Sequence, residues 1–188
     1  MMKTPTREEA FALFLAHNRQ ESLLKHALAV EAALRHFAGL LGEDEEKWGI
    51  IGLCHDLDYE NFPDQHCQMT KAMLEEANWP DDWIRSVLSH AWKLRTDVEP
   101  RSPMEKTLYT VDELTGLITA AALMRPSRSL MDLELASVKK KWKDKAFAAG
   151  VRRDVIQEGA VLMDMPLDEV ISQTILGLRK AAPSLGLA

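Results

Sequence analysis

The most informative stretch of the sequence is Trp48-Gly49-Ile50-Ile51-Gly52-Leu53-Cys54-His55-Asp56-Leu57, which is apolar until it reaches a histidine and an aspartate. We expect it to belong to a helix over residues 43–57, and a helix that is apolar all round lies at the centre of a core. A buried carboxylate without a partner is costly or becomes neutral. The pair His55 and Asp56 therefore needs compensation, and a metal ion bound by both side chains would provide it.

The rest of the chain has helical periodicity, with no convincing period-two stretch. Residues that commonly end or interrupt helices occur at Gly42, Pro80, Pro126 and Pro166. The expected helices cover residues 7–17, 19–41, 43–57, 64–77, 81–95, 103–124, 131–148, 152–163 and 167–181. The sequence predicts an all-α fold, a single compact helical bundle over residues 1–188.

Composition and charge narrow the class of protein. The chain has 188 residues, of which 46% are apolar and 28% charged, which suits one globular domain and argues against disorder. The net charge of −6 argues against nucleic acid as a partner, and the basic run 139–145 is predicted to be a solvated helix end. No apolar run approaches the roughly 20 residues of a membrane span, and no signal peptide is evident, so we expect a cytoplasmic protein without membrane contact.

The two cysteines are too few for a disulfide framework. Cys54 lies in the apolar run and is predicted to be an inert core thiol. Cys67 directly follows a candidate ligand, His66.

Helix faces direct further ionisable residues inward. On the helix over 19–41 the pairs Glu21–Lys25 and Glu31–Arg35 stand four residues apart and are expected on the solvent side, which turns His26 toward the core. His36 lies toward the charged face, and His17 at a helix end. We assign both of these histidines to structure or solvent.

Three more residues occupy apolar faces. Asp112 lies in the apolar stripe of the helix over 103–124 with no Lys or Arg one turn away, and Gly116 leaves room beside it. His66 and His90 align with apolar residues of their expected helices. Four histidines and two aspartates at inward positions on separate helices favour one shared site.

The ordered pattern His26 … His55-Asp56 … Asp112 resembles the signature of the HD superfamily of metal-dependent phosphohydrolases. The additional His66 and His90 resemble its binuclear branch. The similarity spans roughly residues 20–125, which the resemblance makes the core of a single HD-type domain. The helices over about 126–182 would extend the bundle and pack on that core.

The resemblance implies a metal site and a reaction. His26, His55, Asp56 and Asp112 would hold one ion, and Asp56 would bridge to a second ion at His66 and His90. Imidazole and carboxylate ligands suit one or two divalent ions of Mn, Fe, Co, Ni or Zn, whereas Mg is less suited. With His55 and Asp56 at its centre, the site would hydrolyse a small phosphate ester, for example a nucleotide, through a metal-bridging hydroxide.

Substrate contacts and alternatives stay open at this point. Lys93, Arg95 and Arg125 are candidates for binding the phosphate, Asp58 and Lys71 are weaker candidates, and the loop 58–64 is expected to form one wall of the entrance. The HD superfamily also contains di-iron oxygenases with the same six ligands, and a non-catalytic module that binds metal or nucleotide is a third reading. The oligomeric state is open, although amphipathic C-terminal helices could pair in a homodimer.

The acidic and aromatic stretch 57–60 replaces the Lys that many binuclear relatives carry after the His-Asp pair, and no Gly-Tyr-Pro tripeptide occurs. The resemblance therefore does not extend to cyclic-di-GMP hydrolysis.

Overall fold

The computed structural model describes residues 4–188, and within that range every regular element is a helix. The all-α fold predicted from the sequence is confirmed. The helices are α1 (Arg7–His17), α2 (Glu21–Leu41), α3 (Glu45–Leu53), η1 (Pro63–Gln65), α4 (Gln68–Glu76), α5 (Asp81–Leu88), η2 (Ser89–Ala91), α6 (Pro103–Leu123), α7 (Leu135–Lys143), α8 (Arg153–Leu162), α9 (Leu167–Lys180) and α10 (Ala182–Leu185), where η marks a short 3₁₀ helix.

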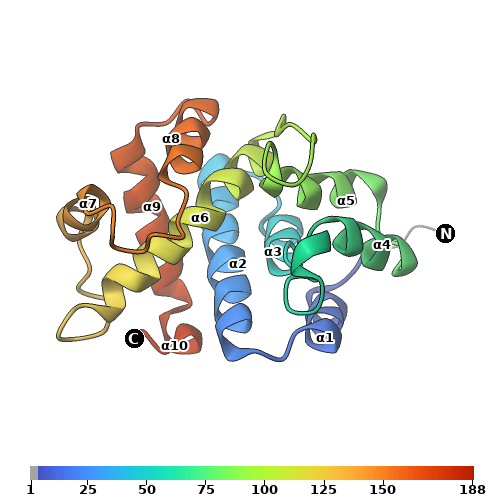
Figure 1. The fold of residues 1–188 in the computed structure, drawn as a ribbon, viewed down its shortest axis with the longest axis horizontal. Helices are drawn as coiled ribbons and strands as arrows, with labels where there is room; N and C mark the ends of the chain where they lie inside the picture. Colours follow the sequence, from blue (N-terminus) through green and yellow to red (C-terminus); the bar gives the residue numbers. More distant parts are fainter. Residues whose placement is uncertain (1–3) are drawn as a thin grey trace.

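Two long helices, α2 and α6, run through the middle of the molecule (Figure 1). Helix α2 packs on α3 on one side and on α9 on the other, and α6 packs on α2 and α8. The segments α1, α3, α4 and α5 therefore lie on one side of the central pair, and α7 to α10 lie on the other (Figure 1). Within residues 4–188 no helix is both long enough and apolar enough to cross a membrane.

Local sequence signals explain where the long helices begin and end. Helix α1 begins with a capping box in which Thr6 and Glu9 satisfy each other's backbone N–H groups. Helix α6 begins in the same way with Ser102 and Glu105. Helix α2 ends at Gly42, whose φ of +70° is a conformation that glycine adopts without strain.

Helix α3 is the centre of the core, as its apolar sequence predicts, since every residue of 48–53 is buried. It can approach α2 closely because of Gly52. A Cβ added there would lie 3.3 Å from the backbone of Glu31.

The prediction that Glu31 faces solvent is wrong. Its side chain is buried where α3 packs on α2, and Arg7 of α1 reaches it from beside α3. Arg7 compensates the carboxylate with hydrogen bonds of 2.6 and 2.9 Å, and Arg35 adds another of 2.9 Å. Burying Glu31 is tolerable because both of its oxygens are paired with guanidinium groups.

Several expected helices are shorter in the structure than in the prediction. Helix α3 ends at Leu53, so His55 and Asp56 follow it in a turn. Nδ1 of the His55 ring donates to the carbonyl of Gly52, which would otherwise accept the next helical hydrogen bond. Likewise, His66 lies between η1 and α4, and His90 lies in η2.

The C-terminal third also differs in detail from the prediction. The expected helix 131–148 is reduced to α7, and the basic run 139–145 lies largely exposed across its end. The short helix α10 was not expected, and its Leu185 is buried against the core.

Candidate metal centre

The structure brings the six predicted residues together from separate segments. His26 comes from α2 and Asp112 from α6, the two central helices. His55 and Asp56 come from the turn after α3, while His66 and His90 come from the segments beside α4 and α5.

The first cluster consists of His26, His55 and Asp112, and it could hold a metal ion. The Nε2 atoms of the two histidines are 3.2 Å apart. One carboxylate oxygen of Asp112 lies 3.0 Å from Nε2 of His26 and 3.3 Å from Nε2 of His55. Three donor atoms therefore converge on one point.

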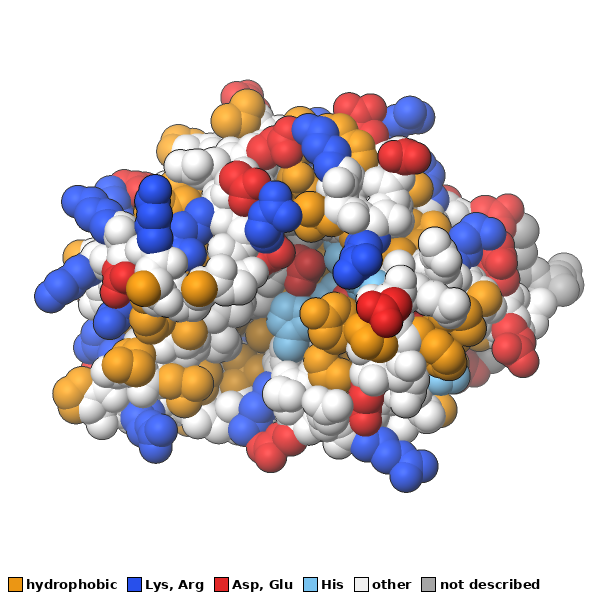
Figure 2. Space-filling model, in the orientation of Figure 1, with side chains coloured by type: hydrophobic (Ala, Val, Ile, Leu, Met, Phe, Trp, Pro, Cys, Tyr) orange, Lys and Arg blue, Asp and Glu red, His pale blue; other side chains and the backbone are white. Residues whose placement is uncertain are grey.

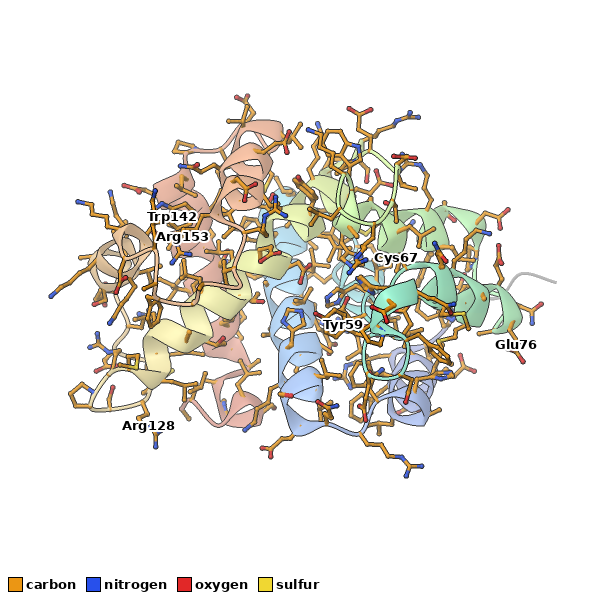
Figure 3. All side chains as sticks on the ribbon, viewed as in Figure 1. Tyr59, Cys67, Glu76, Arg128, Trp142 and Arg153 are labelled. Atoms are coloured by element: carbon orange, nitrogen blue, oxygen red, sulfur yellow. The ribbon has the colours of Figure 1, made fainter. Side chains whose placement is uncertain are left out.

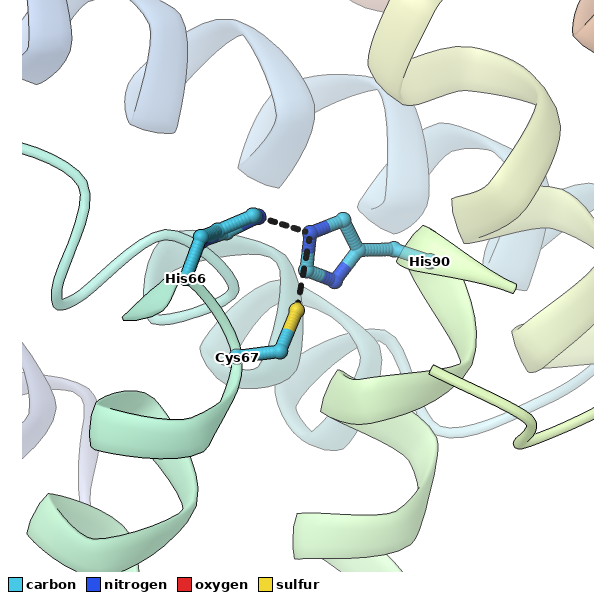
Figure 4. A group of neighbouring side chains, drawn as sticks. All are labelled: His66, Cys67 and His90. Carbon is cyan, nitrogen blue, oxygen red and sulfur yellow. Dashed lines mark hydrogen bonds between the residues drawn. The ribbon is translucent and has the colours of Figure 1, made fainter. Parts of the chain in front are cut away.

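The second cluster consists of His66, Cys67 and His90, and it too could hold a metal ion. The Nε2 atoms of His66 and His90 are 3.1 Å apart, and the sulfur of Cys67 lies 4.0 Å from Nε2 of His90 (Figure 4).

Asp56 lies between the two clusters and offers one oxygen to each. Its Oδ2 is 3.7 Å from Nε2 of His26 and 3.4 Å from Nε2 of His55. Its Oδ1 is 3.5 Å from Nε2 of His66 and 3.4 Å from Nε2 of His90. This is the arrangement expected of a carboxylate that bridges two ions.

Hydrogen bonds at the far side of three imidazoles orient their free nitrogens into the site. Nδ1 of His55 donates to the carbonyl of Gly52 at 2.7 Å, and Nδ1 of His90 donates to the carbonyl of Val87 at 2.6 Å. Nδ1 of His66 lies 2.7 Å from a carboxylate oxygen of Asp58. Because these Nδ1 atoms carry the proton in the neutral ring, each Nε2 presents a lone pair.

The donor atoms of both clusters are chemically suited to bind a cation. Lone pairs of His66 and His90 that face each other at 3.1 Å repel unless a proton or a cation lies between them. A divalent ion bound by imidazole nitrogens and carboxylate oxygens would relieve that repulsion at both clusters. The donor set therefore fits one or two divalent transition-metal ions.

The pKa values of the histidines reflect the surrounding carboxylates. Burial favours the neutral ring of His55, but the carboxylates of Asp56 and Asp112 outweigh it and raise its pKa to about 10. Burial likewise opposes the charged form of His66, yet the hydrogen bond to Asp58 raises its pKa to about 9. The carboxylates therefore favour the doubly protonated form of both rings, and that form competes with metal binding.

The same interactions act on the acidic partners. Burial alone would raise the pKa of Asp56, but the histidines, His55 first, hold it well below its usual value. The pKa of Asp112 is lowered for the same reason, by His55 and His26. Burial also raises the pKa of the Cys67 thiol, but hydrogen bonds to His66 and His90 bring it down to about 7.

A cavity of about 320 Å³ opens onto both clusters. In the space-filling view the histidines lie at the bottom of a hollow on the molecular surface (Figure 2). Its wall includes Tyr59 from the loop after Asp58, as predicted for that loop, and the ring of Tyr59 stands edge-on to His66 at 5.3 Å. In the view of Figure 3 the labels of Tyr59 and Cys67 fall toward the middle of the molecule, whereas Glu76 and Arg128 lie at its periphery.

Of the basic residues predicted to bind phosphate, Arg95 lines the cavity. The other three have carboxylate partners elsewhere and are not among the lining residues of that cavity. Lys93 pairs with Glu158, Lys71 with Glu75, and Arg125 with Asp132. The structure therefore does not bring Lys93, Lys71 or Arg125 to the site.

Asp58 also departs from its predicted role in substrate binding. Its side chain is fully buried, with one oxygen bonded to His66 and the other accepting the backbone N–H of Thr70 at 2.8 Å. It orients a candidate ligand and cannot reach a substrate. The histidines set aside from the sequence remain outside the site, and Nε2 of His36 lies 2.8 Å from the side chain of Gln173 on α9.

Sequence reasoning missed three features of the site and its cavity. Glu113 lines it, and the only sequence signal was its position beside Asp112. Gly150 and Val151 reach it from the segment between α7 and α8, and no motif indicated that. Cys67 was noticed as a neighbour of His66 but was not predicted as part of a cluster.

Comparison with known proteins agrees with the geometry. The family model described as HD domain matches residues 23–120, just over half of the chain, and this range contains all six residues. No curated protein and no solved structure matches the chain. HD domains bind divalent metals and form a superfamily of metal-dependent hydrolases. The matched range and the paired histidine and aspartate clusters together lead to one conclusion: the chain belongs to the HD domain family.

Proposed function

We propose that this protein is a metal-dependent phosphohydrolase that acts on a small phosphate ester, for example a nucleotide. The observation that carries the proposal is the position of Asp56, which offers one oxygen to each histidine cluster at the floor of an open cavity. In this proposal His26, His55, Asp56 and Asp112 hold one ion, and Asp56, His66 and His90 hold a second. Divalent ions at these positions would activate water and neutralise charge on the phosphoryl oxygens.

Arg95 is proposed to bind the phosphate group of the substrate. It lies at the exposed rim of the cavity, and no ion pair within residues 4–188 occupies its guanidinium group. A planar guanidinium can bind two phosphate oxygens at once. Arg95 therefore lies at the cavity, carries a positive charge and has no competing ion pair within residues 4–188.

Glu113 is proposed to carry a proton to the leaving group. Burial raises the pKa of its carboxyl, and the neighbouring Asp112 raises it further. One oxygen accepts the backbone N–H of Arg152 at 2.9 Å, which leaves Oε1 to hold the proton. A carboxyl with a raised pKa beside the reacting group is suited to general acid catalysis.

The test begins with metal-stripped protein reloaded with Mn, Fe, Co, Ni, Zn or Mg and assayed for phosphate release from aryl phosphates and a nucleotide panel. We expect turnover with at least one transition ion and loss of both metal and turnover in Asp56→Ala. In Arg95→Gln we expect KM to rise by about tenfold or more, since one charge-assisted contact is lost. Lys93→Gln is the matched control because Lys93 is paired with Glu158, and its kinetics should match those of the wild type.

Three outcomes would overturn the proposal. Two bound ions without phosphate release, together with oxygen consumption by the iron form, would indicate an HD-type di-iron oxygenase. Nucleotide binding without turnover under any metal would indicate a non-catalytic module. Unchanged metal content in Asp56→Ala would contradict the bridging position of that carboxylate.

A further inference from the structure

The second cluster contains a donor of a different chemical kind, the thiol of Cys67. Its side chain is buried, with 1% of its surface exposed. The donor atoms of His66, Cys67 and His90 all lie within 4.8 Å of one another. The sulfur of Cys67 points at the ring nitrogen of His90 that also faces His66 (Figure 4).

The backbone holds Cys67 in an unusual conformation. Its φ is +70°, which residues other than glycine rarely adopt. Cys67 occupies the position before the first residue of α4, where a side chain commonly caps the helix, yet no side-chain capping bond forms. The strained turn directs the sulfur toward the histidines and leaves the helix end uncapped.

The distances among His66, His90 and Asp56 fit a tetrahedral ion, and the sulfur of Cys67 lies within 4.8 Å of the donor atoms of both histidines. An ion with bonds of about 2.0–2.1 Å to nitrogen or oxygen and about 2.3 Å to sulfur places tetrahedral ligand atoms about 3.4 Å apart, or about 3.6 Å when one is sulfur. The Nε2 atoms of His66 and His90 are 3.1 Å apart, and Oδ1 of Asp56 lies 3.5 and 3.4 Å from them. The 4.0 Å from sulfur to Nε2 of His90 exceeds the ideal by a few tenths of an ångström.

We propose that Cys67 is a ligand of the second metal position, where its thiolate binds the ion together with His66 and His90. The first cluster has only nitrogen and oxygen donors. A thiolate favours softer ions such as Zn²⁺, Co²⁺ or Fe²⁺ over Mn²⁺ and Mg²⁺. The two positions therefore differ in metal preference, and the second selects the softer ion.

This proposal rests on the two-metal site of the proposed function, and its test separates the two. Wild-type protein is loaded with two equivalents of Co²⁺ and its near-ultraviolet absorption is recorded for a thiolate-to-cobalt charge-transfer band. X-ray absorption of the zinc form gives an independent reading that needs no variant. We expect the cobalt band and a zinc–sulfur distance of about 2.3 Å.

Two cysteine variants identify which sulfur binds the metal ion. Cys67→Ala should lose the band and bind the second Co²⁺ or Zn²⁺ at least about tenfold more weakly. Its Mn²⁺ affinity should change far less. Cys54→Ala is the matched control, because Cys54 is buried and its thiol donates to the carbonyl of Ala10, so the band should persist.

Two bound cobalt ions without the band, and zinc without a sulfur neighbour, would overturn the role of Cys67 and leave the two-metal site standing. In that case the thiol only donates a hydrogen bond to His90. Failure of the wild type to bind a second ion would overturn both this proposal and the two-metal site of the proposed function. A charge-transfer band that persists in Cys67→Ala and disappears in Cys54→Ala would also overturn the role of Cys67.

Discussion

Asp56 and Asp58 are separated by one residue and have different surroundings. Asp56 faces the cavity and both histidine clusters. Asp58 is turned away from the cavity, where its two oxygens accept hydrogen bonds from Nδ1 of His66 and from the backbone N–H of Thr70. A carboxylate behind a histidine ligand fixes the ring and makes it a stronger ligand.

Asp58→Asn is predicted to weaken the second metal position selectively. Asn has one acceptor oxygen and one NH₂ group. The NH₂ group would therefore face one of the two N–H groups that now donate to Asp58, and that hydrogen bond would be lost. The affinity for the second ion should fall by about 10- to 100-fold. Calorimetric metal titration measures this, and Asp64→Asn, which changes an exposed residue of η1, should bind like the wild type. Equal losses at both metal positions would argue against the assigned role.

Metal affinity is predicted to rise with pH. The pKa of His55 is raised to about 10 and that of His66 to about 9, so both rings are protonated at neutral pH and must lose a proton to bind metal. The apparent affinity should increase by about tenfold per pH unit for each proton displaced and should level off above about pH 10. Calorimetry in buffers of different ionisation enthalpy counts the protons, and no proton release would contradict this prediction.

At the scale of elements, close contact between α2 and α3 positions the first cluster. Gly52 allows the two helices to approach, and its carbonyl also fixes the ring of His55. His26 on α2 then meets His55 directly after α3, with their Nε2 atoms 3.2 Å apart. Helix packing and ligand geometry therefore depend on the same residue.

Gly52→Ala is predicted to destabilise the protein by about 1–2 kcal/mol. The added Cβ would lie 2.8 Å from Cδ1 of Leu34 and 3.3 Å from the backbone of Glu31. Overpacking of this kind costs about 1–3 kcal/mol, which the better helix propensity of Ala offsets by at most about 1 kcal/mol. Urea unfolding measures the free energy of unfolding, and elemental analysis measures the metal content. We expect both quantities to decrease together.

Gly150→Ala serves as the control because no atom lies within 4 Å of the Cβ it would add. Its stability should remain within about 0.5 kcal/mol of the wild type. A Gly52→Ala protein as stable as this control would contradict the packing argument.

At the scale of the molecule, the cavity takes residues from both sides of the central helix pair. Tyr59 and Arg95 belong to the side that contains α3 to α5, whereas Val151 precedes α8 on the other side. Helix α8 packs on α6, which carries Asp112. We therefore expect residues 126–182 to complete the site and to fold together with the core as one domain.

Metal binding is predicted to stabilise the whole chain in one cooperative transition. A metal that binds only the folded state, at about 100 times its Kd, adds about 2.7 kcal/mol, or about 5–10 °C in Tm for a chain of this size. Thermal unfolding with chelator and then with excess metal measures the shift, which Asp56→Ala should largely lose. A second transition that does not respond to metal would show that the C-terminal helices unfold separately.

The sequence alone determined the fold class and the identity of the candidate ligands. Apolar residues at helical spacing predicted the all-α fold, and the buried-face argument identified His26, His55, Asp56 and Asp112 as inward residues, because burying charge without compensation is costly. The family match over residues 23–120 agrees with the pattern of these residues. Helix ends were less predictable, since the ring of His55 competes with the backbone for the carbonyl of Gly52.

Only the tertiary structure decided how the two carboxylates and the basic residues are used. Asp56 and Asp58 are chemically identical, and their opposite orientations follow from the turn after α3. Lys93 and Arg95 both follow His90 closely in the sequence, but Glu158 on α8 pairs with Lys93 and leaves Arg95 at the cavity. Contacts between segments far apart in the chain depend on helix packing, which a one-dimensional pattern does not encode, and for that reason Glu113, Val151 and the sulfur of Cys67 emerged only in three dimensions.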